Sequence, residues 1–308
     1  MFETVKLNNT FVAEVRGISL NDELSDCEVE WLVNALAEHS VLLIRGRSMD
    51  VKQHQHFTKR LGQVRDQCIH SWTPEVLAEA DPAKNGNLGR YPVINVGNVL
   101  YFVNGPGLSE GDEDPHAQWD QPPTTELGKG TSCWHTGDTE KVDVEVVNFL
   151  YAEVAPGHAG ETLFCDTVAA YDALSPGMRS RLDELRVIHF FTHPKPTPPV
   201  SQPLVKQNPM TGRKSLYINY YSMDRIEGVS EQESKTLLDE LFHHVTQDKF
   251  IYTHKWRQHD LVFWNCNTTM HKRSTLSSSE RRVLRRTQAV IPALQSVKPW
   301  ERTRLVEQ

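Results

Sequence analysis

From Ser132 to Thr139 the chain reads SCWHTGDT, and this short stretch is the first indication of both fold and chemistry. Many Fe(II) sites are built from two histidines and one carboxylate, and the first histidine and the carboxylate are commonly written His-x-Asp or His-x-Glu. Here His135 is followed two residues later by Gly137. If His135 binds a metal, a position usually filled by a carboxylate is open to an anion from solution.

Three further residues have the side chains that such a site needs. Thr162 lies 27 residues after His135 in the run GETLF, and His271 ends the run WNCNTTMH. Arg286 lies 15 residues after His271 in the run RRVLRRT. Neutral imidazole nitrogens suit Fe(II). An arginine is an always-charged fork that matches a carboxylate.

These residues and their spacing resemble the taurine dioxygenase and 2,4-dichlorophenoxyacetate dioxygenase family (TauD/TfdA) of Fe(II)/2-oxoglutarate-dependent oxygenases. In that family the threonine that contacts 2-oxoglutarate often lies twenty-seven residues after the first metal histidine. The arginine that holds the distal carboxylate lies fifteen residues after the second. Other stretches also match habitual family segments, so that the resemblance covers nearly the whole chain. These stretches are 41–46, 169–174, 203–214 and 256–261.

The resemblance implies that His135 and His271 bind Fe(II), that Thr162 and Arg286 bind 2-oxoglutarate, and that O2 is consumed. It implies an α+β fold with a double-stranded β-helix core of the jelly-roll or cupin type. Helices flank this core, and a long loop precedes the first metal histidine. The implied activity is that of an oxidoreductase, which functionalises an unactivated C–H bond of a small molecule by a ferryl-oxo radical mechanism.

Gly137 makes the expected reaction more specific. Known His-x-Gly and His-x-Ala members of the wider superfamily are halogenases, and a chloride in place of the carboxylate leaves the charge sum at iron unchanged. Residues i and i+2 of an extended segment point to the same face, so Asp138 is expected to point away. The spacing of 27 residues between His135 and Thr162 equals the family spacing, so no inserted residue is present that would shift the carboxylate from position 137 to position 138. We therefore predict a halogenase, with chloride at the position vacated at Gly137.

Two other hypotheses stay open. A local bulge that turns Asp138 toward the metal, or in second place a contribution from Glu140, would restore a third ligand and give a hydroxylase or dioxygenase. Loss of the carboxylate would alternatively leave a non-catalytic pseudoenzyme. Retention of both histidines, Thr162 and Arg286 argues against a pseudoenzyme.

The pattern along the chain predicts one domain over residues 1–308. Apolar spacing predicts helices over 22–39 and 49–61, and a helical segment over 168–185 that is interrupted by Ser175-Pro176. A Ser-x-x-Glu capping box opens a further helix over 230–245. Strands are predicted at 41–44, 93–96, 99–103, 144–151, 161–164, 214–219, 260–265 and 285–291.

Residues 104–130 are rich in Gly, Pro, Asp, Glu and Thr and nearly free of aliphatic side chains, which predicts a long loop. Its place immediately before His135 favours an active-site lid. Four residues are candidate contacts to the small-molecule substrate, and they are chosen only for the sequence segments in which they lie. They are His70, Asn95, Trp119 and Arg282.

Composition excludes several classes of protein. The chain of 308 residues is 38% hydrophobic, which suffices for a buried core. Its formal net charge is −7 and its 33 Lys and Arg form no long basic run, so neither nucleic acid nor a membrane is an expected partner. No signal peptide or bilayer-spanning run is evident, which favours a cytoplasmic protein. Five scattered cysteines argue against a disulfide framework, and homo-oligomerisation stays open.

Overall fold

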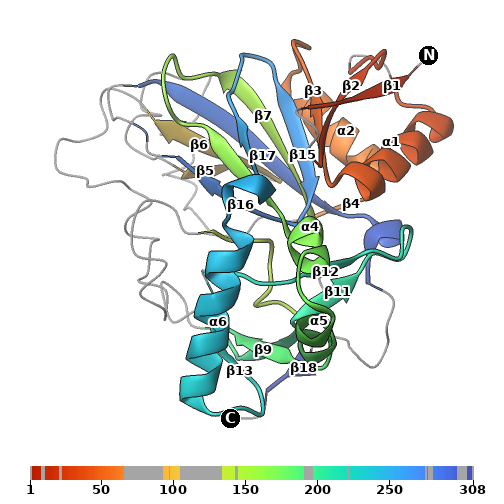
Figure 1. Ribbon diagram of the computed structural model, residues 1–308. Coiled ribbons are helices and arrows are strands. Elements are labelled where there is room, and N and C mark those ends of the chain that lie inside the picture. Colours follow the sequence, from red (N-terminus) through yellow and green to blue (C-terminus); the bar gives the residue numbers. More distant parts are fainter. Residues whose placement is uncertain are drawn as a thin grey trace.

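The computed structural model of the protein describes residues 2–7, 11–20, 23–65, 93–96, 98–104, 134–142, 145–190, 197–220, 222–274, 276, 280–296 and 304–306 (Figure 1). Its α-helices are α1 (Asp26–His39), α2 (Val51–Leu61), α4 (Thr167–Asp172), α5 (Pro176–Asp183) and α6 (Glu231–Val245), and its 3₁₀ helices are η3 (Asp248–Phe250) and η4 (Pro292–Leu294). Its strands are β1 (Glu3–Lys6), β2 (Val12–Arg16), β3 (Val41–Ile44), β4 (Gln63–Val64), β5 (Val93–Val96), β6 (Val99–Asn104), β7 (Val147–Val154), β8 (Thr162–Asp166), β9 (Arg186–His189), β10 (Val200–Pro203), β11 (Val205–Gln207), β12 (Lys214–Leu216), β13 (Met223–Ile226), β14 (Ile251–His254), β15 (Leu261–Asn265), β16 (Thr269–Arg273), β17 (Arg282–Val290) and β18 (Arg304–Leu305).

Two sheets form the framework of the described part of the chain. The large sheet has nine strands in the order β1-β2-β3-β15-β7-β17-β6-β5, with β4 paired to β17. The small sheet has the order β14-β8-β16. A third sheet, β13-β9-β10-β18, and the hairpin β11-β12 complete the described strands. Apart from the parallel pair β2–β3, the strand pairs are antiparallel.

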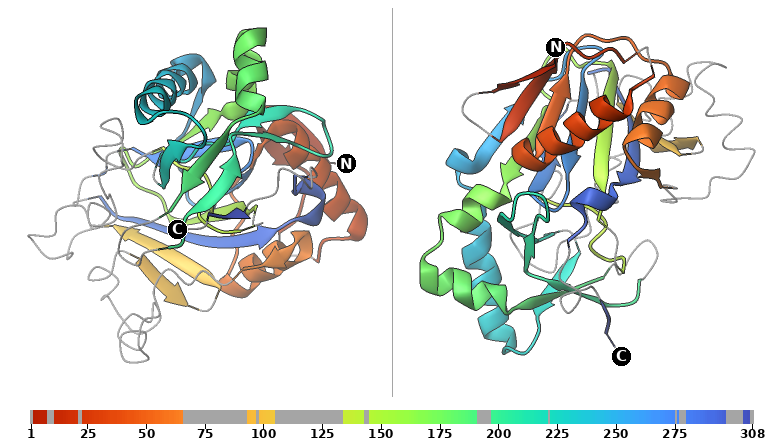
Figure 2. Two further views of the ribbon diagram at one scale, coloured as in Figure 1. Left: turned by 90° about the horizontal axis from the view of Figure 1, so that it is seen from below. Right: turned by 90° about the vertical axis from the view of Figure 1, so that its right-hand side faces the viewer.

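The two faces of the large sheet have different partners. Phe149 and Tyr151 of β7 pack in one apolar cluster with residues of α1 and α2, which cover that face (Figure 2). Leu150 of β7, on the opposite face, packs in a second cluster with Phe164 of the small sheet. Successive side chains of a strand point to opposite faces, which explains this division. The two sheets thus enclose a common interior, and the fold is the predicted jelly roll with flanking helices.

The small sheet also has two different faces. Cys165 and Met270, a directly opposed pair on β8 and β16, pack in a cluster with residues of α4 and α6. The next pair, Phe164 and His271, therefore points the other way, into the space between the sheets. The register of β16 against β8 is what places His271 in the interior.

Side-chain caps explain why two helices begin later than predicted. The Ser25 hydroxyl accepts a hydrogen bond from the Glu28 backbone N–H, and the Glu28 carboxylate accepts one from Ser25, so α1 begins at Asp26. Asp50 and Gln53 form the same box before α2. The predicted interruption at Ser175-Pro176 is confirmed, because Ser175 caps α5.

Several predictions concern residues that lie partly or wholly outside the described ranges. Of the predicted lid at 104–130, only Asn104, the last residue of β6, is described. The single domain over 1–308 stays a prediction. Within the described ranges, no helix is both long and apolar enough to cross a lipid bilayer.

Candidate metal centre

His135 and His271 lie side by side, as predicted. The two residues form an isolated antiparallel bridge, in which the His135 N–H donates to the His271 carbonyl at 3.1 Å and the His271 N–H donates back at 2.7 Å. Their imidazole rings are 4.1 Å apart between centroids. Backbone pairing thus holds side by side two histidines that are 136 positions apart in the sequence.

The surroundings of His271 keep its imidazole neutral. Burial, followed by the charges of His135 and Arg286, lowers the pKa of His271 well below its usual range. Trp264 packs edge-on against the His271 ring, with 4.8 Å between the ring centroids. The buried Nδ1 of His271 has no hydrogen-bond partner among the described residues. A neutral, buried imidazole with a free nitrogen suits a metal ligand.

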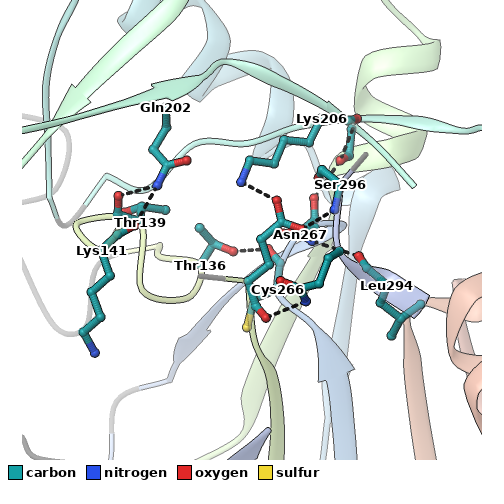
Figure 3. Close-up of polar contacts among 12 residues, drawn as sticks. Thr136, Thr139, Lys141, Gln202, Lys206, Cys266, Asn267, Leu294 and Ser296 are labelled. Atoms are coloured by element: carbon teal, nitrogen blue, oxygen red, sulfur yellow. Dashed lines mark hydrogen bonds and ion pairs between the residues drawn. The ribbon is translucent and has the colours of Figure 1, made fainter. Parts of the chain in front are cut away.

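The loop that leads into β16 is fixed by a buried polar network (Figure 3). The Asn267 side chain donates to Glu145 Oε2 at 2.6 Å, and Lys206 Nζ lies 2.6 Å from Glu145 Oε1. The Ser296 N–H donates to the same carboxylate at 2.7 Å. Burial opposes the charge on Glu145, but Lys206 and Ser296 outweigh it and lower the pKa of this carboxyl. An ionised, fully bonded carboxylate therefore holds the segment before His271 in place.

The chain bends at Gly137, so the alternation expected of an extended segment ends there. The Thr139 N–H donates to the Gly137 carbonyl at 2.8 Å, and Asn219 donates to the same oxygen at 3.3 Å. The Thr136 hydroxyl contacts the carbonyl oxygens of Cys266 and Thr269, the latter at 3.0 Å. The rule that residues i and i+2 share a face cannot decide where Asp138 points.

The volume that a side chain at position 137 would enter is occupied. A Cβ atom on Gly137 would lie 2.8 Å from Val146 Cγ2, closer than real Cβ atoms approach, and 3.0 Å from Cys266 Cβ, which is tight. This corrects the picture of an empty carboxylate volume at Gly137, because Val146 and Cys266 occupy the position that a Cβ atom would enter.

Asp138, the alternative third ligand, has other partners. Its Oδ2 lies 2.6 Å from Arg65 Nη1 and 3.1 Å from Lys141 Nζ, and its side chain is 18% exposed. Among the described residues, no cluster of three or more His, Cys, Asp and Glu has the arrangement of a metal site. Asp138 and Glu140 are therefore not placed as third ligands beside the two histidines.

Thr162 lies on the same face of the small sheet as His271. It precedes Phe164, the cross-strand partner of His271, by two residues, which corresponds to about 6–7 Å along the strand. The Trp256 indole N–H donates to Thr162 Oγ1 at 3.0 Å. A tryptophan can only donate, so the proton of Thr162 must point elsewhere. Thr162 is 3% exposed, and that proton has no acceptor among the described residues.

Arg282 and Arg286 occur on one face of β17 but have different neighbours. Arg286 is partly buried, and its charge lowers the pKa of His271. Arg282 lies toward Gly160, where a Cβ atom would be 3.5 Å from Arg282 Cδ. Burial and then the charge of Arg273 lower the pKa of Arg282, and its buried Nε has no hydrogen-bond partner among the described residues.

These features fit Fe(II) and a dicarboxylic 2-oxo acid. The neutral imidazole of His271 and the adjacent ring of His135 can hold the metal at one end of the interior. At the other end, the Thr162 hydroxyl and the Nε of Arg282 offer buried donors that find no acceptor within the described ranges. A buried donor without a partner is costly, and an anionic ligand would remove that cost.

The remaining predicted substrate contacts have different outcomes. His70 and Trp119 lie outside the described residues, as does the side chain of Asn95, whose backbone is in β5. Reasoning from the sequence missed Arg65, which follows β4, and Trp256, which precedes β15. Trp256 lies in the stretch 256–261 that matches a family segment, but neither residue could be given a role from the sequence, because each acts through a partner remote in the sequence.

A jelly roll with two adjacent histidines and buried donors for a carboxylate agrees with the class of 2-oxo-acid-dependent non-haem iron oxygenases. The family model described as "Taurine catabolism dioxygenase TauD, TfdA family" matches residues 3–288. The chain belongs to this family of 2-oxoglutarate-dependent dioxygenases, which use Fe(II), 2-oxoglutarate and O2.

Individual relatives agree with this assignment. The chain is 29% identical over 299 residues to an "Alpha-ketoglutarate-dependent 2,4-dichlorophenoxyacetate dioxygenase" of Burkholderia sp. (strain RASC), with 91% of each chain covered. It is 28% identical to "Pentalenolactone F synthase" of Streptomyces arenae, with 89% of this chain and 90% of that one covered. A crystal structure of a putative alpha-ketoglutarate-dependent taurine dioxygenase from Burkholderia xenovorans matches with a TM-score of 0.76 at 26% identity, over 100% of this chain and 99% of that one.

Proposed function

We propose that this enzyme holds Fe(II) with His135 and His271 and leaves the third protein position to an exogenous anion. With chloride there, the reaction is halogenation of a small molecule. The observation that carries the proposal is the position of Asp138, whose carboxylate is bound by Arg65 and Lys141. Two of the similar proteins named above are dioxygenases by name and the third is a synthase, so halogenation goes beyond what similarity supports.

When bound, Fe(II) would activate O2, the oxidant that allows a hydrogen atom to be removed from a C–H bond of the substrate. The overall reaction is balanced: R–H, halide, 2-oxoglutarate, O2 and one proton give R–halide, succinate, CO2 and water. Charge supports a halide ligand as well, because chloride replaces the single negative charge of the missing carboxylate. The residues of this chain bind and orient the reactants, and none of them acts as a nucleophile.

We further propose an exchange of the two arginine roles that the sequence suggested. Arg282 and Thr162 together bind the distal carboxylate of 2-oxoglutarate, since the Nε of Arg282 and the hydroxyl proton of Thr162 are buried donors without an acceptor in the described part of the chain. Arg286 lies beside His271, at the end of the interior where the 2-oxo acid group meets the metal. The offset of about 6–7 Å between Thr162 and the partner of His271 suits the length of the five-carbon diacid.

A hydroxylase is the second candidate function. The bend between Gly137 and Thr139 supports it, because this turn departs from the extended geometry that would direct Asp138 away from the metal. In that case metal binding would draw Asp138 from Arg65 to the iron. The dioxygenase named among the relatives agrees with this alternative.

An anaerobic titration separates the two functions. Protein loaded with Fe(II) and 2-oxoglutarate is titrated with chloride and then bromide, and the metal-to-ligand absorption band is recorded. O2 is then added in the presence of small amines and carboxylic acids, and products are identified by mass spectrometry. Halogenation predicts a halide-dependent shift of the band and products that carry the added halide. A halide-insensitive band with only oxygen-added products would refute it.

Trp256 provides a prediction about cosubstrate binding. Replacing it with phenylalanine removes the N–H that orients Thr162, so the affinity for 2-oxoglutarate is expected to fall about 5- to 10-fold, the worth of one hydrogen bond. The change should appear in KM for 2-oxoglutarate, with kcat little altered. Trp31→Phe, on α1, is the matched control. An unchanged KM in Trp256→Phe would show that Thr162 needs no such orientation.

A further inference from the structure

Arg65 is firmly attached to the edge of the large sheet, close to the candidate metal centre. Its backbone N–H donates to the Gln288 carbonyl at 2.9 Å, next to the pairing of β4 with β17. Its side chain is 21% exposed and reaches Asp138 at 2.6 Å. Lys141 approaches the same Asp138 oxygen from within the turn at 3.1 Å. Two cations thus share one carboxylate oxygen, three residues after the first histidine.

Neutral hydrogen bonds fix the turn around this carboxylate. Gln202 donates to the Thr139 carbonyl at 2.8 Å and to the Lys141 carbonyl at 3.2 Å (Figure 3). The Thr139 hydroxyl lies 2.8 Å from the Ser222 hydroxyl and accepts from Asn219 at 2.9 Å. Because the backbone on the C-terminal side of Asp138 is held this tightly, the direction of the Asp138 carboxylate depends on its own partners.

We propose that Arg65 determines the reaction specificity of this enzyme by holding the Asp138 carboxylate away from the two histidines. Lys141 assists it. The open coordination position then results from an ion pair as well as from Gly137. This inference rests on the proposed function.

Asp138 is three residues after His135, in the turn that follows this histidine. Burial lowers the pKa of Arg286, and the charge of Asp138 opposes this shift. The charge of Arg286 in turn contributes to the lowered pKa of His271. Asp138 is therefore electrostatically coupled to the interior that contains the histidines. Without Arg65, this partly buried carboxylate would lose its shortest ion pair, and a bound Fe(II) ion would be the strongest cation within reach.

An arrangement in which Asp138 binds the metal predicts the opposite change in Fe(II) affinity. If Asp138 is a metal ligand in the loaded enzyme, Arg65 would orient and stabilise that ligand. Removal of residues that support a metal ligand typically weakens metal binding 10- to 100-fold. The direction of the change in Fe(II) affinity therefore discriminates between a residue that withholds Asp138 and one that presents it.

The test compares the wild type, Arg65→Met and the double variant Arg65→Met/Asp138→Asn. Arg181→Met removes an exposed arginine that is paired with Glu233 and is the matched control. Fe(II) affinity is measured anaerobically by calorimetry with 2-oxoglutarate present, and chloride affinity from the absorption band of the loaded protein. Circular dichroism verifies that each variant is folded.

We expect Arg65→Met to bind Fe(II) as tightly as the wild type or more tightly, and chloride at least 10-fold more weakly. The double variant should regain chloride binding, because asparagine cannot replace the anion. A fall in Fe(II) affinity of 10-fold or more in Arg65→Met, or an unchanged chloride affinity, would overturn the role of Arg65. A wild type without any chloride response overturns the proposed function instead, and the Fe(II) affinities then still decide whether Arg65 withholds or presents Asp138.

Discussion

Replacing His271 with alanine is expected to abolish Fe(II) binding, because the variant removes one of only two protein ligands in the proposed site. The dissociation constant for Fe(II) should rise by at least about 100-fold, beyond the effect of losing a residue that merely supports a ligand. Turnover of 2-oxoglutarate should be lost with it. Anaerobic calorimetry with Fe(II), in the presence of 2-oxoglutarate, measures the effect directly.

The buried position of His271 requires controls for folding. Its ring packs against Trp264, so alanine leaves a cavity that destabilises the interior. His271→Gln keeps most of the volume and should lose iron as well. His243→Ala, on the exposed side of α6, should bind iron normally. A 3-fold change in the dissociation constant corresponds to about 0.6 kcal/mol of binding free energy. If folded His271→Gln binds Fe(II) with an affinity within this limit of the wild type, His271 is not a ligand.

Replacing Arg282 with methionine is expected to have the second largest effect. Charge-assisted hydrogen bonds contribute about 1.5–3 kcal/mol each, so the affinity for 2-oxoglutarate should fall by about 10- to 150-fold. The same change should stabilise the apoprotein, because a buried cation that faces Arg273 becomes a neutral side chain. We expect Tm of the apoprotein to rise by about 2 °C or more. The stabilisation that 2-oxoglutarate gives to the wild type should largely disappear.

Arg286→Met is the matched comparison for Arg282→Met. In the proposed arrangement Arg286 lies beside His271, so its loss should affect the distal carboxylate less than the loss of Arg282. Calorimetric binding of 2-oxoglutarate to the two variants gives the ranking. A larger loss in Arg286→Met, with Arg282→Met near the wild type, would restore the assignment that spacing alone suggested.

Much of the fold follows from local patterns. The buried run at 41–44 forms β3 as predicted, and the Ser-Pro break separates α4 from α5. The jelly roll itself came from a family resemblance, because periodicity cannot tell which strands pair. β16, which carries His271, was not predicted as a strand, since 269–273 is polar and short. Its strand geometry depends on the pairing with β8, which is remote in sequence.

The sequence spacing of the site residues allowed some of them to be predicted. The features of the site that depend on side-chain packing could not be predicted. The spacing of His135, Thr162 and His271 marked residues that the two sheets bring into one interior. The bend at Gly137 and the occupied volume beside it depend on Val146 and Cys266, which no motif connects to position 137.

Contacts between remote residues account for the rest of what the sequence could not predict. The Arg65–Asp138 pair spans 73 positions, and the Trp256–Thr162 bond spans 94. Long-range pairs of this kind arise only after the chain has folded. They nevertheless decide the direction of a carboxylate and the orientation of a hydroxyl proton.

The central claim is that no carboxylate of this chain completes the iron site. The most direct measurement is the Fe(II) affinity of Asp138→Ala, determined anaerobically with 2-oxoglutarate and chloride present. The account predicts a dissociation constant within about 3-fold of the wild type, because Asp138 is bound to Arg65 and Lys141 and contributes no ligand. A loss of about 100-fold or more, comparable to that of His271→Ala, would contradict it and identify Asp138 as the third ligand of a hydroxylase.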